Sequence, residues 1–474
     1  MATTKLTFGE WLPDQPGVSG AVTDAKNCYP VSNGYAPFPS EANYSDDAAQ
    51  ELLITFAGKF GGVTTLFAAG ATQIYKFDSN DASLDAATTT GYSAVESWDV
   101  TQFGAKIILA NGSDKLQSWT LNSSSNFANL SADAPRAKFV TVVKDFVVAA
   151  NVGGEENKVY WSDINDETDW VPSAASQSDF QVMPDGGDIT GLAGGEYGLI
   201  FLERAIYRMT YAGSPFFFQF DAISRSLGCI SNGSIAQYGG LTYFLADDGF
   251  YVCDGQSVRQ IGAEKVNRWF FDNAVPGQII TGMSSTVDPI RKLVIWRFSG
   301  TFNTKYILIY SIDLDRWSYA ITTATSLSFV LTPSATLEQV DNYNSSIDAL
   351  DIPLDSPVFA GGRLLFAGVS GSKIIAFSGQ PKTANITTGD IAIGRSTITL
   401  VKPIVDNGSA SVAVSSRDLL NEVVEFYQET AADAENRISL RSNGEYHRLR
   451  LTPTGANWKT AVGMEVDVFK QGNR

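Results

Sequence analysis

Histidine and cysteine are scarce in this 474-residue chain, which has one histidine, His447, and three cysteines, Cys28, Cys229 and Cys253. The shortage of histidine removes most metal centres and most general-base mechanisms. The cysteines are widely spaced and form no CxxC pair, so no zinc knuckle or redox motif is present. We therefore predict that the chain is not an enzyme and has no catalytic residue, cofactor or metal site. His447 lies in an alternating strand, and we interpret it as a surface or interface histidine.

Positive charge is also in short supply. Lys and Arg number 34 against 51 Asp and Glu, so the formal net charge is −17. A protein that grips DNA by its phosphates needs a basic face. We expect DNA to pass this surface without sequence-specific binding, and the acidity also favours solubility.

Long apolar runs are lacking as well. The N-terminal segment Met1-Ala-Thr-Thr-Lys has no apolar signal core, and no window approaches the length of a membrane-spanning helix. We expect no membrane insertion and a protein that is made and assembled in a cytoplasm.

The residues that are abundant favour strands and tight turns. The chain has 42 glycines, 28 phenylalanines and 18 tyrosines, and Thr, Ser and Val recur throughout. Helix is predicted only for residues 264–273 and 417–428. The length exceeds what one ordinary core supports, so more than one domain is expected.

A loose repeat begins after residue 50. Each unit reads as an apolar strand, a turn, a second apolar strand and a third strand with an aromatic residue. The units cover residues 52–77, 95–121, 139–161, 189–211, 230–261, 279–319 and 357–377. Their spacing of roughly 40 to 50 residues is the period of propeller blades. One small sheet cannot bury both faces alone, whereas radial packing covers each face with the next sheet.

The predicted fold is therefore all-β, with a β-propeller of about seven blades over residues 51–379, six or eight remaining possible. Residues 1–50 form an extended N-terminal arm that contributes to the propeller or to a subunit contact. Residues 380–474 form a C-terminal β-sandwich, because residues 446–451 alternate at period two. We expect the apolar second strand of each blade near the axis, and residues 338–357 as a surface excursion. An array of sandwiches or barrels without radial closure is the alternative.

Paired carboxylates occur at Asp46 and Asp47, at Asp247 and Asp248, and within residues 163–169. Each lies in a turn-like stretch, where Asp caps its own backbone. A glycosidase would need two carboxylates facing one another across a cleft, and nothing marks any pair for that role. Residues 163–169 lack the central glycine and closing glutamate of a calcium loop.

Two aromatic clusters stand out, in residues 213–220 and 268–271. They fit either the packing between blades or a contact between subunits, because aromatic anchors dominate interfaces. The candidate interface residues are Phe216, Phe217, Phe218, Trp269 and Phe270.

Several strings together resemble a known family. They are Val159-Tyr-Trp-Ser-Asp, Asp188-Ile-Thr-Gly-Leu, Gly228-Cys-Ile-Ser-Asn and Asp247-Asp-Gly-Phe-Tyr, with the arm from Trp11 to Pro39 and the C-terminal GEYHRLRL. In order and texture they are similar to the tail nozzle, tail hub or packaged-DNA stabilisation proteins of short-tailed bacteriophages.

That resemblance implies a structural virion protein located in the tail. It implies a homo-oligomeric ring, hexameric in that family, around the DNA exit channel below the portal and the head-to-tail adaptor. It also implies a platform for tail fibres or spikes, although no fibre-docking insertion is visible in this sequence. The alternative function is a propeller that binds or hydrolyses host surface polysaccharide, which predicts solvent-exposed tryptophans and facing carboxylates in a cleft.

Overall fold

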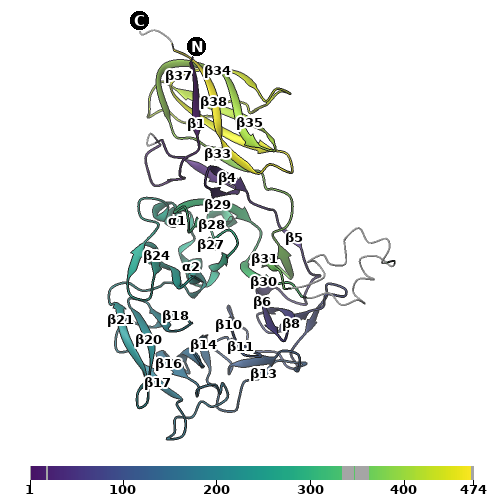
Figure 1. Cartoon of the computed structure of the whole chain (residues 1–474), viewed down its shortest axis with the longest axis vertical. Coiled ribbons are helices and arrows are strands. Elements are labelled where there is room, and N and C mark those ends of the chain that lie inside the picture. Colours follow the sequence, from purple (N-terminus) through teal and green to yellow (C-terminus); the bar gives the residue numbers. More distant parts are fainter. Residues whose placement is uncertain (1, 18–19, 334–345, 347–361, 471–474) are drawn as a thin grey trace.

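The computed structural model describes residues 2–17, 20–333, 346 and 362–470 (Figure 1). Most of the predicted excursion at residues 338–357 lies outside these residues. The described chain is dominated by short antiparallel strands, which form six separate four-stranded sheets and one larger sheet. Four strands at one end of the larger sheet form one further unit of the same kind, which brings the total to seven.

The units follow one another along the chain. The first unit consists of β6 (Leu52–Phe60), β7 (Val63–Gly70), β8 (Ile74–Phe77) and β9 (Leu84–Ala86). The second consists of β10 (Asp99–Phe103), β11 (Lys106–Ala110), β12 (Gln117–Thr120) and β13 (Ala128–Asn129). The third consists of β14 (Ala137–Val143), β15 (Phe146–Val152), β16 (Glu155–Trp161) and β17 (Asp179–Val182). The fourth consists of β18 (Ile189–Ala193), β19 (Gly198–Leu202), β20 (Ile206–Gly213) and β21 (Phe217–Ser224). The fifth consists of β22 (Ala236–Tyr238), β23 (Leu241–Ala246), β24 (Gly249–Cys253) and β25 (Val258–Gln260).

The sixth unit is β26 (Ser284–Asp288), β27 (Leu293–Ser299), β28 (Lys305–Ser311) and β29 (Arg316–Thr322). The seventh is β30 (Ser326–Leu331), β31 (Leu364–Ser370) and β32 (Lys373–Ala376), with β5 (Ala42–Asn43) as its outer strand. The units stand around a central space (Figure 1). The arrangement confirms the predicted all-β propeller, with a number of blades inside the predicted range.

The strand nearest the axis is the first of each unit, so the expectation of an axial second strand is wrong. Residues of β6, β10, β14, β18, β22, β26 and β30 line the central space. The second strands lie between the first and third strands of their sheets, and β19 is buried at every residue. Their apolar runs reflect burial of both faces by neighbouring sheets, whereas the first strands border the polar cavity.

The N-terminal arm closes the propeller. Ala42 and Asn43 of β5 pair with β32, more than 300 residues away in the sequence, and the Tyr44 amide donates to the Ile374 carbonyl at 2.9 Å. The Tyr44 ring stacks on Phe77 of the first unit, with 5.2 Å between ring centroids. The last unit therefore takes its outer strand from the beginning of the chain, which fastens the ring of sheets.

A second element of the arm joins the propeller to the C-terminal region. Strand β2 (Asp24–Lys26) pairs in parallel with β29 of the sixth unit and antiparallel with β33 (Asn385–Thr387). Backbone hydrogen bonds thus run without interruption from the propeller into the C-terminal sheet. The two regions are connected by a continuous ladder of hydrogen bonds.

The C-terminal region, predicted as a β-sandwich, is an additional antiparallel sheet whose apolar side chains continue the core of the arm and the sixth unit. Its strands are β34 (Ile391–Asp406), β35 (Ser409–Arg417), β36 (Thr430–Ala431), β37 (Ile438–Thr454) and β38 (Thr460–Lys470), joined by β1 (Ala2–Thr7), β3 (Cys28–Val31) and β4 (Gly34–Pro37). Buried residues such as Val412, Leu449 and Val466 belong to one cluster with the arm and the sixth unit.

Helices are few and short in the described residues. They are α1 (Asn267–Asn273), α2 (Pro276–Gly282), and the 3-10 turns η1 (Asn232–Ser234) and η2 (Thr301–Asn303). The first lies inside the predicted helix at 264–273. Residues 418–429 follow β35 without helix, so that prediction is wrong; Leu419 and Val423, which would form its apolar stripe, are exposed. Within the part of the chain that the structure describes, no helix has the length and apolarity needed to cross a membrane.

Candidate functional site

The first strands of all seven units enclose a central cavity of about 1240 Å³. One lining residue from each unit illustrates its mixed chemistry: Leu53, Asp99, Lys138, Thr190, Gln237, Ser284 and Leu327. A smaller cavity of about 310 Å³ is bordered by β6, β10, β26 and β30. Polar and charged side chains share the lining of the larger cavity with apolar ones, so polar partners for water are present.

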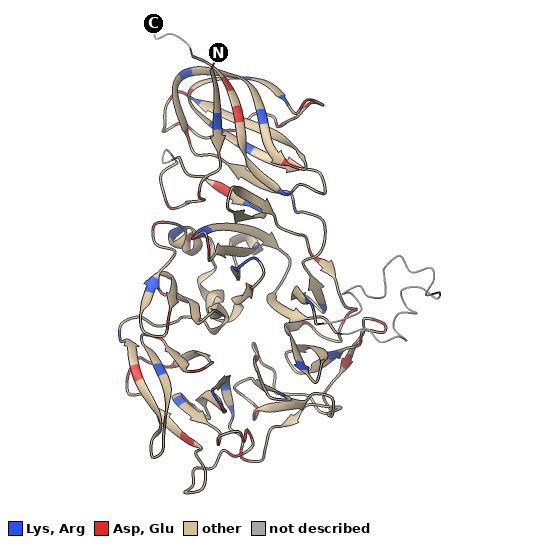
Figure 2. Cartoon of the chain, in the orientation of Figure 1, with Lys and Arg blue, Asp and Glu red and all other residues tan. Residues whose placement is uncertain are grey.

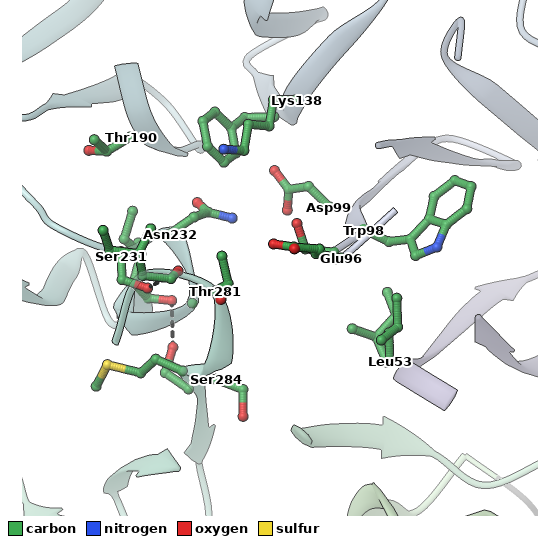
Figure 3. Close-up of a pocket in the computed structure, with 18 of the residues that line it drawn as sticks. Leu53, Glu96, Trp98, Asp99, Lys138, Thr190, Ser231, Asn232, Thr281 and Ser284 are labelled. Atoms are coloured by element: carbon green, nitrogen blue, oxygen red, sulfur yellow. Dashed lines mark hydrogen bonds between the residues drawn. The ribbon is translucent and has the colours of Figure 1, made fainter. Parts of the chain in front are cut away.

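Asp99 and Asn232 face one another across this cavity (Figure 3). Asp99 begins β10, and its carboxylate accepts the Val100 amide at 3.1 Å and the Val140 amide at 3.0 Å. Burial raises the pKa of Asp99 to about 6, although these amides and the Asn232 side chain oppose the shift. Side chains from the second unit and from the turn that precedes the fifth unit therefore point toward each other inside the cavity.

That meeting limits what can pass along the propeller axis. The major groove of a DNA duplex is itself about 12 Å wide. Because the Asp99 and Asn232 side chains interact inside the cavity, the cavity does not form an open passage for such a duplex. The volume of the cavity is sufficient for water, ions or a small molecule.

The candidate interface residues in 213–220 divide into exposed and buried members. Phe216, in the turn between β20 and β21, is 79% exposed. Phe217 is partly buried, and Phe218 is 4% exposed with its ring 5.0 Å from Phe146 and 5.2 Å from Trp161. Phe218 thus packs between the third and fourth units, which leaves Phe216 as the side chain that a partner could contact.

The second aromatic cluster receives the chain's own N-terminal arm. Phe270 is fully buried, and partly buried Trp269 meets Trp11 edge-on with 4.9 Å between ring centroids. The Asp14 carboxylate accepts the backbone amides of Arg268 at 2.9 Å and Trp269 at 2.8 Å. A residue of the arm thus caps the N-terminus of α1. Sequence reasoning identified both aromatic clusters but could not distinguish contacts within the chain from contacts between chains.

His447 is fully buried in the C-terminal sheet, which corrects its interpretation as a surface or interface residue. Its Nε2 lies 3.0 Å from the Ser396 hydroxyl and its Nδ1 lies 2.6 Å from the Ser416 hydroxyl. Burial lowers the pKa of His447. Although a histidine beside serines could suggest nucleophilic chemistry, neither ring nitrogen is accessible to a substrate.

The carboxylates at Asp247 and Asp248 and within residues 163–169 occupy turns, whereas Asp47 lies in an irregular segment and accepts the Ser372 hydroxyl at 2.6 Å. Asp163 accepts the Gln177 amide at 2.7 Å, Asp166 accepts the Thr168 amide at 2.9 Å, and Asp248 accepts the Tyr251 hydroxyl at 2.8 Å. Across residues 2–17, 20–333, 346 and 362–470, no group of three or more His, Cys, Asp or Glu side chains could hold a metal ion.

Tryptophan is almost entirely internal, which counts against a carbohydrate platform. Eight of the nine tryptophans are at most 6% exposed, and the ninth, Trp269, packs against the arm. Trp98 lies at the cavity wall, but its indole Nε1 donates to the Gly70 carbonyl at 2.9 Å.

Comparison with known proteins adds no relative. No family model matches the chain, and no curated protein matches it.

Proposed function

We propose that this protein is a structural component of the tail of a short-tailed bacteriophage, where identical copies form a ring around the DNA exit channel. The observation that carries the proposal is the mechanical continuity of the chain. Strand β5 fastens the propeller and β2 links its sixth unit to the C-terminal sheet by backbone hydrogen bonds. A subunit connected in this way can transmit mechanical force to the neighbouring subunits of the ring, as a tail component must.

Charge supports the same role. The chain carries a net charge of −17, and Figure 2 shows acidic and basic residues interleaved around the propeller and along the C-terminal sheet. A wall of this composition offers DNA phosphates no continuous basic surface to hold them. The duplex would run along the axis of the ring of subunits, because Asp99 and Asn232 project into the central cavity of each propeller.

The proposed partners follow from the position in the tail. One face of the ring meets the head-to-tail adaptor, the rim carries fibres or spikes, and assembly takes place in the host cytoplasm. No catalytic step, cofactor or metal is required for this work.

Light scattering on the purified full-length chain tests the proposal. We expect a mass that is an integral multiple of the 51.1 kDa subunit, hexameric by the family resemblance, with ring-shaped particles in negative stain. Head-to-tail interfaces that close by rotation give such rings. A chain that stays monomeric at high concentration, and that is absent from virions, would defeat the proposal.

The polysaccharide alternative makes a different prediction. It requires saturable binding of an oligosaccharide, or its cleavage, by the isolated chain. The buried tryptophans leave that alternative without an exposed aromatic platform in the described residues.

A further inference from the structure

Arg297 is a buried cation on the wall of the central cavity. It lies in β27 of the sixth unit, is 4% exposed, and belongs to the cavity lining. Its Nε donates to the Ala324 carbonyl at 3.1 Å, and its Nη1 donates to the Gly282 carbonyl. Both acceptors are neutral backbone groups, so they orient the guanidinium without cancelling its charge.

Within the part of the chain that the structure describes, no carboxylate forms an ion pair with Arg297. Burial lowers the pKa of Arg297 to about 10. Burial and, second, the positive charge of Arg297 lower the pKa of Lys305, with Glu51 opposing this only in part. Removing a charge from water is expensive unless an opposite charge compensates it. Among the residues that the structure describes, the buried guanidinium therefore has no counter-charge.

The remaining donors match an oxyanion. A guanidinium carries five N–H groups in a rigid plane, and two of them are used by Ala324 and Gly282. The planar fork binds carboxylate and phosphate groups in a bidentate manner. The hydroxyl residues Thr281 and Ser326 line the same cavity. They lie within two residues of Gly282 and Ala324, whose carbonyls accept hydrogen bonds from Arg297. The cavity is also large enough for a small molecule that carries such a group.

We propose that Arg297 anchors an oxyanion-binding site in the wall of the central cavity, specific for a phosphate or carboxylate group on a small ligand. The bound group supplies the missing counter-charge at the guanidinium. The site belongs to each subunit and does not depend on ring assembly. The competing role is a purely structural clamp between the Gly282 and Ala324 carbonyls, which needs no ligand.

Calorimetric titration of the wild-type full-length chain tests the site, with inorganic phosphate in one arm and acetate in the other. Chloride at matched ionic strength serves as the reference. We expect one saturable site per chain and a matching rise in thermal midpoint, because a ligand that binds only the native state stabilises it. Binding of phosphate alone, acetate alone or both supports the site and identifies its chemistry. Absence of saturable binding in both arms overturns it.

Two cavity cations provide the matched variants. Arg297→Met removes the anchor, and we expect binding to weaken at least about tenfold, since hydrogen bonds to charged groups are strong. Lys138→Met removes an exposed cation from the same cavity and should leave binding intact. Unchanged affinity in Arg297→Met, or equal loss in both variants, contradicts the assignment. If Arg297→Met does not fold, Arg297→Lys replaces it: a point charge without the fork should also bind at least about tenfold more weakly, and unchanged affinity contradicts the site.

Discussion

Arg448 holds Asp390 in a bidentate ion pair within the C-terminal region, with Nε to Oδ1 at 3.1 Å and Nη2 to Oδ2 at 2.8 Å. Arg417 adds a third hydrogen bond to the same carboxylate at 2.6 Å. The arm closes over this group, because the Asp390 amide donates to the Gly17 carbonyl and a Cβ at Gly17 would lie 2.4 Å from Arg448 Nη2. One buried carboxylate thus ties the arm to two strands of the C-terminal sheet.

Asp390→Ala should destabilise the C-terminal sheet by about 3–5 kcal/mol, because it leaves two largely buried guanidinium groups without a partner. Chemical denaturation combined with hydrogen exchange of β35 and β37 amides measures the effect. Asp418→Ala is the control. Its ion pair with Arg395 is half exposed at 3.4 Å, so we expect a change below about 1 kcal/mol. If the two variants lost equal stability, burial of the Asp390 ion pairs with Arg417 and Arg448 would not be the source of the stabilisation.

Closure of the propeller by β5 predicts a strong effect of proline at position 44. Tyr44→Pro removes the amide that donates to the Ile374 carbonyl, along with the ring that stacks on Phe77. We expect a loss of about 1–3 kcal/mol and faster hydrogen exchange in β31 and β32. Tyr44→Phe keeps both the amide and the ring, and should lose much less stability than Tyr44→Pro. Exchange in β31 and β32 that is unaffected by proline would argue against closure by the arm.

His447 predicts a pH-dependent contribution to the stability of the C-terminal sheet. Burial lowers the pKa of the folded state below the ordinary value of about 6.5. The unfolded state therefore binds more protons than the folded state once the pH falls toward and below that value, so stability is lost on acidification. In His447→Gln this contribution is absent. The stability gap between wild type and variant, measured from pH 7 to pH 5, should shrink as the pH falls; a constant gap contradicts the assignment.

The interaction between Asp99 and Asn232 predicts a second pH effect. Here acidification should increase the stability of the variant, whereas for His447 it decreases the stability of the wild type. Asn232→Asp places a carboxylate opposite Asp99, whose pKa burial already raises to about 6. Like charges repel, so we expect a loss of about 1–3 kcal/mol at pH 7 that diminishes below pH 6 as Asp99 takes up a proton. Asn232→Ala, which adds no charge, should show a smaller pH dependence. Denaturation curves of both variants at pH 5 and pH 7 provide the test.

Local sequence patterns were sufficient for the individual sheets. The stretch at 139–161 became β14, β15 and β16, and the stretch at 230–261 became β22 to β25, because alternating and apolar runs between turns specify hairpins. The same patterns could not identify which strand lies at the axis. A continuous apolar run indicates burial on two faces, and both a central strand and an axial strand can satisfy that condition.

Contacts between distant segments could not be read from local patterns. Asn43 pairs with Ile375, Lys26 with Tyr319, and Asp14 caps a helix that begins at residue 267. Nothing in the two-residue strand β5 distinguishes it from a loop. The unpaired charge of Arg297 was equally hidden, because its significance lies in the absence of a carboxylate in three dimensions among the described residues.

Cryo-electron microscopy of the assembled full-length protein tests the central claim most directly. We predict a closed ring of identical subunits in which every propeller is fastened by its own N-terminal strand and the wide passage lies on the axis of the ring. A map that shows only isolated subunits, or an open passage for a duplex through the middle of a single propeller, would contradict it.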